Sequence, residues 1–369
     1  MHTNIKKVIK VMDQIAPRHL AESWDNVGLL VGDENKMVQN ILVALEVTDD
    51  VINEAIEKNV DLIITHHPLI FKPLKQINSN DPISQMVLKL IQHNINLFTA
   101  HTNLDISEVG TCHYMADLLE LERVSYLTTT SEDNLYKINC YVPVSHKEEV
   151  KEALFKAGAG QYEDYDSCAY ETNGIGQFRP LEGANPFIGD IGKVEYTEEV
   201  CIETIVKHHD LSNVINALLK AHPYEEPAYD VIKTEKIINQ RGIGVYGYTQ
   251  TTIIDLVNEL KDILEVEHLK VVGDLNKKIS SVAVVTGAGS DYIRQAAKRV
   301  DVLITGDLKY HEAHYAKQLK LNVIDAGHFE TENVFMPRLK TLLDGYFEKK
   351  SYDINVMVSE SNVNPFQLI

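Results

Sequence analysis

The sequence predicts an α/β protein with two parts: a duplicated outer domain with mostly parallel sheets, and an inserted ferredoxin-like domain of βαββαβ order. Near both ends of the 369-residue chain, short apolar segments rich in β-branched residues alternate with stretches of helical period, which is typical of βαβ units. The middle of the chain follows a different pattern. We therefore expect a discontinuous outer domain over residues 1–128 and 239–369, with the insert over residues 129–238.

The first part of the chain is predicted to begin with an amphipathic helix and to continue with four strands. The opening segment MHTNIKKVIKVMDQIAP places apolar residues on one helical stripe, namely Ile5, Val8, Ile9, Met12 and Ile15. The expected strands are GLLVG, NILVALE, DLIITH and INLFTAH, and the segment DDVINEAIEKN between the second and third strands has the helical period.

The last part of the chain repeats this pattern. Its expected strands are SSVAVVTG, VDVLITG and LNVIDAG, and a final helix is expected from about Glu330 to Leu343. Residues 41–67 align with residues 282–307 with a single-residue slip, and the two segments share the cores VDLIIT and VDVLIT. We therefore predict an internal duplication, although shared βαβ patterning alone can also produce a likeness of this length.

The predicted insert begins after the polar stretch TTTSEDN. Its expected elements are the strand KINCYVPV, a helix over KEEVKEALFKAG, a strand near DSCAYET, a loop rich in glycine and proline, the strand VCIETIV, a helix over LSNVINALLKA and the strand AYDVIKT. This βαββαβ order is that of a ferredoxin-like unit, whose two ends can lie close together. Such a unit can be inserted into another domain.

Composition excludes several classes of protein. Lys and Arg number 35 against 54 Asp and Glu, and the resulting net charge of −19 disfavours duplex nucleic acid as a partner. No run of about 18 apolar residues is present to span a bilayer, so we expect no membrane association. The four cysteines have no CxxC spacing, which argues against a disulfide framework or a thiolate zinc site and favours a cytoplasmic location.

Histidines and carboxylates follow several of the predicted strands at the point where each strand ends. These residues are His66 and His67, His101 with Asp105 four residues later, and His328 with Glu332 four residues later. The carboxyl ends of parallel strands meet at one edge of a sheet, where ligands bind in open α/β folds. Imidazole and carboxylate groups suit zinc, iron or manganese, and the absence of nearby cysteine argues against a purely structural zinc site.

Local geometry limits how these residues can act together. Adjacent strand residues point to opposite faces, so His66 and His67 share a site only if the strand has already ended. Glu332 shares a face with His328 if a helix begins at His328. Asp105 has two oxygens and could bridge two ions. Taken singly, a histidine with an acid four residues later is more often a solvated pair than a set of metal ligands, and only the combination of the motifs favours a metal site. We interpret the glycine turn GAGSD (Gly287–Asp291) as structural because it lacks a P-loop lysine.

Five motifs in this order resemble the Nif-three-like family, whose members are widely called GTP cyclohydrolase I type 2 homologues. The motifs are AESWDNVGLLVG (21–32), THHPLIF (65–71), AHTNLD (100–105), TGDLKYH (305–311) and GHFETE (327–332). The resemblance runs essentially from end to end of the chain. The insert, with GQFRPLEGANPFIG and AHPYEEPAYD, resembles a CutA-like or PII-like domain.

The resemblance implies a dinuclear metal centre and an oligomer. The family's ligand pattern falls on His66, His67, Asp105, His328 and Glu332, with two divalent ions per chain, zinc first and iron or manganese as alternatives. It also places His101 close to the metals, where it either supports a metal ligand or faces the substrate. The family assembles as hexamers, so the resemblance implies a homohexamer.

The expected function is that of a metal-dependent hydrolase acting on a nucleotide or a related small molecule. Two ions would activate a water at neutral pH, and His101 would act as the catalytic group that donates or relays a proton. Opening of the GTP ring is the reaction that the family name suggests, and phosphoester hydrolysis is the alternative. The competing hypothesis is a non-catalytic, metal-binding regulatory or assembly protein whose CutA-like insert senses a ligand.

Overall fold

The computed structural model describes residues 3–367 and divides the chain into two compact units. The first unit combines Met1–Thr130 with Arg241–Ile369, and the second is Ser131–Gln240, whose limits lie two residues from those expected for the insert. The two points where the chain leaves and re-enters the first unit are adjacent, because the Thr130 backbone N–H donates to the Arg241 carbonyl at 2.9 Å. Within the described residues, no helix is long and apolar enough to cross a membrane.

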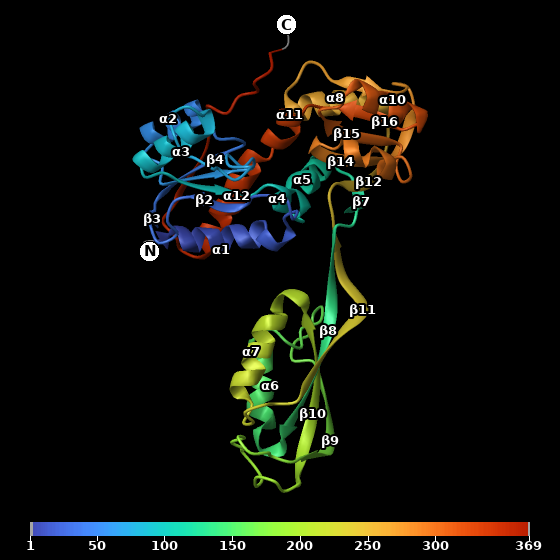
Figure 1. Cartoon of the computed structure of the whole chain (residues 1–369). Coiled ribbons are helices and arrows are strands. Elements are labelled where there is room, and N and C mark those ends of the chain that lie inside the picture. The colour runs from blue at the N-terminus through green and yellow to red at the C-terminus, as the bar shows by residue number, and fades with distance from the viewer. Residues whose placement is uncertain (1–2, 368–369) are drawn as a thin grey trace. The chain divides into compact units, whose positions relative to one another are not determined.

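The first half of the first unit is built around a five-stranded sheet. Its strand order is β17 (Asn355–Val358), β4 (Asn40–Ala44), β5 (Leu62–Thr65), β6 (Asn96–Thr99) and β2 (Gly28–Val31). The first four strands are parallel and β2 is antiparallel to β6. The accompanying helices are α1 (Ile5–Ile15), α2 (Asp49–Glu57) and α3 (Pro82–Gln92), and β1 (Thr3–Asn4) pairs with β3 (Met37–Val38) (Figure 1).

The second half has a six-stranded sheet. Its order is β13 (Lys270–Val272), β16 (Asn322–Asp325), β15 (Val302–Gly306), β14 (Lys278–Ala288), β12 (Val245–Thr252) and β7 (Glu122–Tyr126). The central strands β14, β15 and β16 are parallel, as β4, β5 and β6 are in the first half. Helix α8 (Ile253–Leu264) lies between β12 and β13, and α9 (Ile293–Ala296) and α10 (Tyr310–Gln318) connect the three parallel strands.

Equivalent details in the two halves support the predicted duplication. Asn96 begins β6 and Asn322 begins β16, and each side-chain oxygen faces a glycine with φ +124°. These glycines are Gly32 and Gly273, where an added Cβ would lie only 2.0 and 2.1 Å from the asparagine oxygen. A generic βαβ pattern does not require this contact, so its recurrence favours a common origin of the halves.

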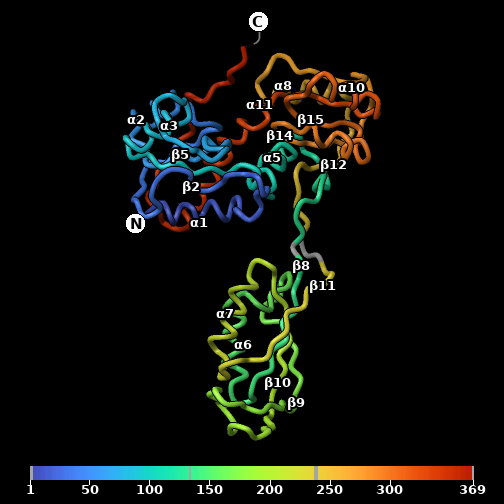
Figure 2. Tube along the Cα trace, in the orientation of Figure 1, coloured from blue at the N-terminus to red at the C-terminus, as the bar shows by residue number. Residues whose placement is uncertain are grey.

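The two halves exchange helices after their last parallel strands. After β6 come α4 (Thr102–Ile106) and α5 (Thr111–Leu118), and α5 buries Met115 and Ala116 in the core of the second half. After β16 come α11 (His328–Asn333) and α12 (Met336–Lys349), and α12 packs beside α1 in the core of the first half (Figures 1 and 2). The crossing segments bring residues of both halves to one place.

The expected single helix from Glu330 to Leu343 is wrong, because the chain forms two helices there. Pro337 stands in the first turn of α12, where a helix needs no backbone N–H donor. Because proline has no N–H, it cannot donate the backbone hydrogen bond that would continue α11. The break lets α11 point into the junction of the halves while α12 buries Leu339 and Leu343 in the first half.

The second unit follows the βαββαβ order. Its elements are β8 (Ser131–Pro143), α6 (Lys147–Lys156), β9 (Ala169–Phe178), β10 (Glu195–Lys207), α7 (Leu211–Ala221) and β11 (Tyr229–Arg241), with the sheet order β11-β8-β10-β9. Helices α6 and α7 pack on one face of this sheet around a core of its own (Figure 1). The likeness of this unit to CutA stays a prediction.

A buried carboxylate on α2 anchors the segment that follows β17. Glu54 accepts hydrogen bonds from Lys58, from the Ser359 hydroxyl and from the backbone N–H groups of Glu360 and Ser361. Burial would raise the pKa of Glu54, but these hydrogen bonds outweigh it and lower the pKa to about 2. The ionised carboxylate therefore ties the end of the chain to the first half.

This anchor predicts a loss of stability in acid. The folded-state pKa of Glu54 lies below its unfolded value, so its contribution is complete above about pH 4.5 and is lost as the pH falls toward 2. We expect Glu54→Gln to lose up to about 3 kcal/mol at pH 7 and much less at pH 3, measured by denaturant unfolding. Glu57→Gln, at an exposed position of the same helix, is the control. Equal losses at both pH values would contradict the assignment.

Candidate metal centre

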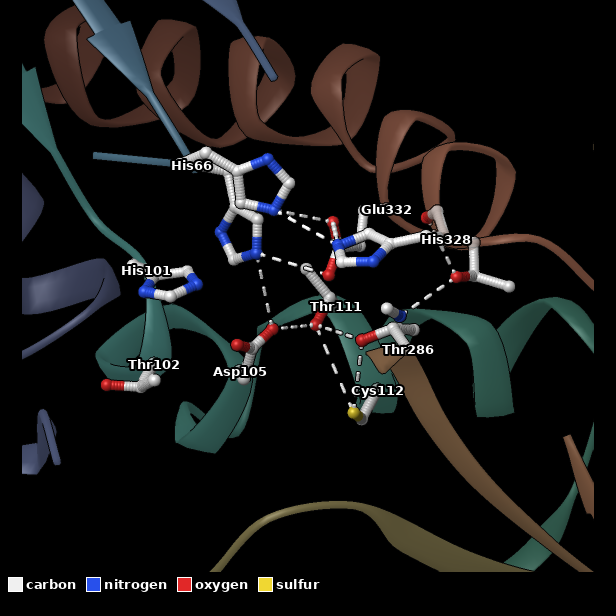
Figure 3. Close-up of polar contacts among 12 residues, drawn as sticks. His66, His101, Thr102, Asp105, Thr111, Cys112, Thr286, His328 and Glu332 are labelled. Atoms are coloured by element: carbon white, nitrogen blue, oxygen red, sulfur yellow. Dashed lines mark hydrogen bonds and ion pairs between the residues drawn. The ribbon is translucent and has the colours of Figure 1, made fainter. Parts of the chain in front are cut away.

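The six residues singled out from the sequence meet where the two halves of the first unit join. Strand β5 ends at Thr65, so His66 and His67 lie beyond it and both can face the junction, as the prediction required. Three groups of these residues have potential ligand atoms within 4.8 Å of one another: His66, His67 and His101; His67, His328 and Glu332; and His66, Asp105 and Glu332 (Figure 3). Sequence positions that span 267 residues thus form one cluster of imidazoles and carboxylates.

Glu332 belongs to two of these groups through different oxygens. Its Oε2 lies 2.9 Å from Nε2 of His67 and 3.1 Å from Nε2 of His328, which begins α11 one turn earlier. Its Oε1 lies 3.6 Å from Nε2 of His66, and Oδ1 of Asp105 lies 3.6 Å from the same nitrogen. Glu332 is therefore the carboxylate shared by two groups, whereas Asp105 belongs to one group and accepts a hydrogen bond from Thr111.

The spacing of these atoms fits divalent cations. Two ligands at about 2.1 Å from a tetrahedral ion lie roughly 3.4 Å apart, close to the separations around Glu332. Nε2 of His66 is fully buried and has no hydrogen-bond partner among the described residues. A buried polar atom without a partner is costly. A cation between His66, Asp105 and Glu332 would satisfy this nitrogen, so the residues present fit a metal site.

Each of the four histidines is held by its other ring nitrogen. Nδ1 of His66 lies 2.9 Å from the Ala100 carbonyl, and Nδ1 of the others lies within 2.9 Å of a carboxylate oxygen: Glu46 for His67, Asp25 for His101 and Asp307 for His328. A hydrogen bond at Nδ1 fixes the orientation of the ring and leaves Nε2 available to bind a metal. This is the usual arrangement around histidines that bind metals.

The carboxylates of the centre favour positive charge on the neighbouring histidines. Burial would lower the pKa of His67, but hydrogen bonds to Glu332 and Glu46 outweigh it and raise the pKa to about 10. The hydrogen bond to Glu332 likewise raises the pKa of His328 to about 9. Burial acts on Glu332 in the opposite direction to its histidine neighbours, and the histidines hold its pKa well below the usual range. In the metal-free chain protons supply the charge that a cation would otherwise provide.

His101 is held against a buried carboxylate. The Asp25 side chain is completely buried; Oδ1 lies 2.9 Å from Nδ1 of His101, and Oδ2 accepts hydrogen bonds from the backbone and hydroxyl of Thr102. Burial would raise the pKa of Asp25, but the hydrogen bonds from His101 and Thr102 outweigh it and lower the pKa to about 2. Asp25 therefore fixes a His101 tautomer with Nε2 free to accept or give a proton.

Sequence reasoning missed several residues of the centre. Asp25, Glu46 and Asp307 were not assigned a role. Glu46 is the last residue of one predicted strand and Asp307 follows another, and that position was the available signal. Gly287, interpreted as structural, lies against the centre. It has φ +66°, and an added Cβ would lie 2.1 Å from Oε1 of Glu332. The glycine therefore provides room for the shared carboxylate.

All of these residues belong to the first unit, so the second unit is expected to be dispensable for metal binding. Removing residues 131–240 and joining Thr130 to Arg241 through a short linker should leave the metal content per chain unchanged, because those two residues are already hydrogen-bonded. Elemental analysis of the deletion variant beside the full chain checks this. Loss of metal from a variant that circular dichroism shows to be folded would mean that the second unit contributes to the site.

Comparison with known proteins places the chain in a family. The model of the family Duf34/NIF3 (NGG1p interacting factor 3) matches residues 3–365. The chain belongs to the Duf34/NIF3 family. A relative from Bacillus subtilis (strain 168), named GTP cyclohydrolase 1 type 2 homolog, is 40% identical over 369 residues and 99% of each chain. A Staphylococcus aureus (strain MSSA476) relative of the same name is 39% identical over 368 residues, 99% of this chain and 100% of the relative.

Two solved structures share the fold of this chain. The crystal structure of the Bacillus cereus protein related to NIF3 is 37% identical, covers 100% of this chain and 99% of that chain, and has a TM-score of 0.87. Reduced HcgD from Methanocaldococcus jannaschii is 20% identical with a TM-score of 0.60 over 98% of this chain and 99% of that chain, which shows a common fold only. NIF3 membership and the cluster of possible ligands agree with the family that the sequence motifs indicated.

Proposed function

We propose that this NIF3 protein binds two divalent ions, with zinc as the first candidate, and hydrolyses a nucleotide or a related small molecule. The observation that supports this most is the position of Glu332, whose two oxygens face two different ligand groups. His66 and Asp105 would hold one ion, His67 and His328 the other, and Glu332 both. Neither group uses a cysteine, which distinguishes the arrangement from a closed structural zinc site.

The ions would activate the water, and the protein side chains would transfer the proton. A pair of bound divalent ions lowers the pKa of a coordinated water and polarises the bond under attack. His101 lies beside His66 and His67 but is not needed to complete either group around Glu332. Its Nε2 is free because Asp25 holds Nδ1, so His101 can take a proton at Nε2 and pass it to the leaving group. Asp25 stabilises the protonated ring that this transfer creates.

The class of substrate is proposed from the relatives as well as from the site. Curated relatives carry the name GTP cyclohydrolase 1 type 2 homolog, which suggests a purine nucleotide as one candidate. The net charge of −19 gives no global attraction for phosphates, so anchoring of a nucleotide falls to the ions and to local lysines. Phosphoester hydrolysis needs the same water and the same proton transfer.

The role of His101 separates catalysis from metal binding. We expect His101→Ala to keep two ions per chain and to lose about 100-fold or more in turnover, because it removes proton transfer alone. Metal content by elemental analysis and turnover on a panel of nucleotides and phosphoesters measure the two effects. His268→Ala, at an exposed position, is the control. Loss of one ion in His101→Ala would make His101 a ligand, and unchanged turnover would remove it from the reaction.

A regulatory role is the second candidate, and one feature of the second unit favours it. That unit holds a cavity of about 630 Å³ lined by Phe178, Phe187 and Tyr224, with Glu199 hydrogen-bonded to the Tyr224 hydroxyl. A cavity of this size accommodates a small ligand. If the metal-loaded protein turns over no compound of the panel above a metal-free control, sensing through this unit becomes the better account.

A further inference from the structure

We infer that Trp24 and Phe71 form a stacking site for a planar aromatic ring at the edge of the metal centre, and that its ligand carries an anionic group beside the ring. The inference rests on the proposed function, since it names the class of molecule that would reach the same centre. It adds a binding surface that none of the metal-binding groups provides.

The two aromatic side chains are exposed, although large apolar side chains are usually buried. Trp24 is 58% exposed and Phe71 is 45% exposed, and their ring centroids lie 5.9 Å apart with the planes tilted by 60°. Both residues lie on loops, and the loops are joined because the Asn26 side chain donates to the Ile70 carbonyl at 2.5 Å. Open aromatic faces held in place are suited to stacking on a flat ring.

The position of Trp24 is fixed relative to the centre. Its neighbour Asp25 has a completely buried side chain and is bonded to His101 and Thr102, which anchors the loop. The Trp24 ring meets His101 edge to face, with centroids 6.3 Å apart. The His101 centroid lies 5.2 Å from that of His66, so a single imidazole separates the exposed indole from the metal-binding histidines. A ring resting on Trp24 is thereby held beside the reacting groups.

Two cations lie beside Phe71 in the same hollow. Lys72 and Lys75 are exposed, follow Phe71 on the same loop, and form no ion pair within residues 3–367. Together with Phe71 they line a hollow of about 390 Å³. Unpaired lysines are notable in a chain of net charge −19, and they would receive a phosphate or carboxylate carried by the stacked molecule.

The experiment uses the single tryptophan of the chain, because tryptophan fluorescence then reports on Trp24 alone. The metal-loaded full chain is titrated with guanosine monophosphate, guanosine and ribose 5-phosphate. We expect the two ring compounds to change the emission, the monophosphate to bind more tightly than guanosine, and ribose 5-phosphate to cause no change. Absence of a response to both ring compounds, or calorimetric binding of ribose 5-phosphate as tight as that of the monophosphate, would overturn the inference.

Variants test which side chains make the site. By calorimetry, Trp24→Leu should weaken guanosine monophosphate binding about tenfold or more, and Trp24→Phe should restore part of it. Phe71→Leu keeps the fluorescent reporter and should weaken the response, while Tyr170→Leu, at a 68% exposed position of the second unit, should bind like the parent. Unchanged affinity in Trp24→Leu with full metal content would contradict the stacking role.

The outcomes for the stacking site and for the hydrolase can be told apart. Turnover of ribose 5-phosphate without any emission change from ring compounds would support the hydrolase activity and contradict the stacking site. The converse result is an emission change from ring compounds that is lost in the Phe71→Leu variant, with no turnover of any compound. It would support the stacking site and contradict the hydrolase activity.

Discussion

Glu332→Gln is expected to abolish binding of both metal ions, because the two oxygens of Glu332 serve both ligand groups. The substitution keeps the shape of the side chain but removes its charge and replaces one oxygen with an NH₂ group that faces histidine nitrogens. Asp105→Asn should remove only one ion, because Asp105 faces His66 and not the pair of His67 and His328. Elemental analysis of the purified variants, with circular dichroism to confirm folding, measures both effects.

Glu330→Gln is the matched control for this comparison. Glu330 lies on the same helix, but its carboxylate accepts a hydrogen bond from Asn364 and belongs to none of the ligand groups. Its variant should keep two ions per chain. Retention of one ion by Glu332→Gln, or loss of both ions from Asp105→Asn, would contradict the role of Glu332 as the shared ligand.

Gly287→Ala is expected to have the second largest effect, although it removes no ligand. The added methyl group would lie 2.1 Å from Oε1 of Glu332 and 3.2 Å from Nε2 of His328, so the shared carboxylate must move. The positive φ of +66° adds strain for any side chain, on the order of 1 kcal/mol. We expect metal affinity to fall at least about 100-fold, measured by competition with a chelator.

Gly345→Ala is the matched control for Gly287→Ala. Gly345 lies in α12, and an added Cβ there meets no atom within 4 Å. Alanine favours a helix over glycine by about 1 kcal/mol, so this variant should keep its metals and gain slightly in stability. Normal metal affinity in Gly287→Ala would show that Glu332 can move without cost and would contradict the close fit.

Local pattern was sufficient to predict most of the residues that could bind a metal. Each of the residues His66, His67 and His328 follows a strand whose apolar run is visible in the sequence, and parallel strands end at a common edge. The four-residue spacing of His328 and Glu332 needed only a helix that begins at His328, and α11 begins there. These predictions depend on periodicity within short segments, which is the most dependable signal in a single sequence.

The rest of the centre depends on contacts that no local pattern reveals. Asp25 meets His101 across 76 positions of the chain, and Gly287 meets Glu332 across 45. Asp105 on α4 and Glu332 on α11 lie directly before α5 and α12, the helices that pack on the opposite halves, and no local pattern predicts that packing. Periodicity fixes the face of a helix but not the partner on which that face packs.

Anomalous diffraction from crystals of the metal-loaded protein tests the shared carboxylate most directly. We expect two peaks per chain about 3.5–4 Å apart, with one Glu332 oxygen coordinating each. One peak lies beside His66 and Asp105, and the other beside His67 and His328. A single peak, or two peaks without Glu332 between them, would contradict this expectation.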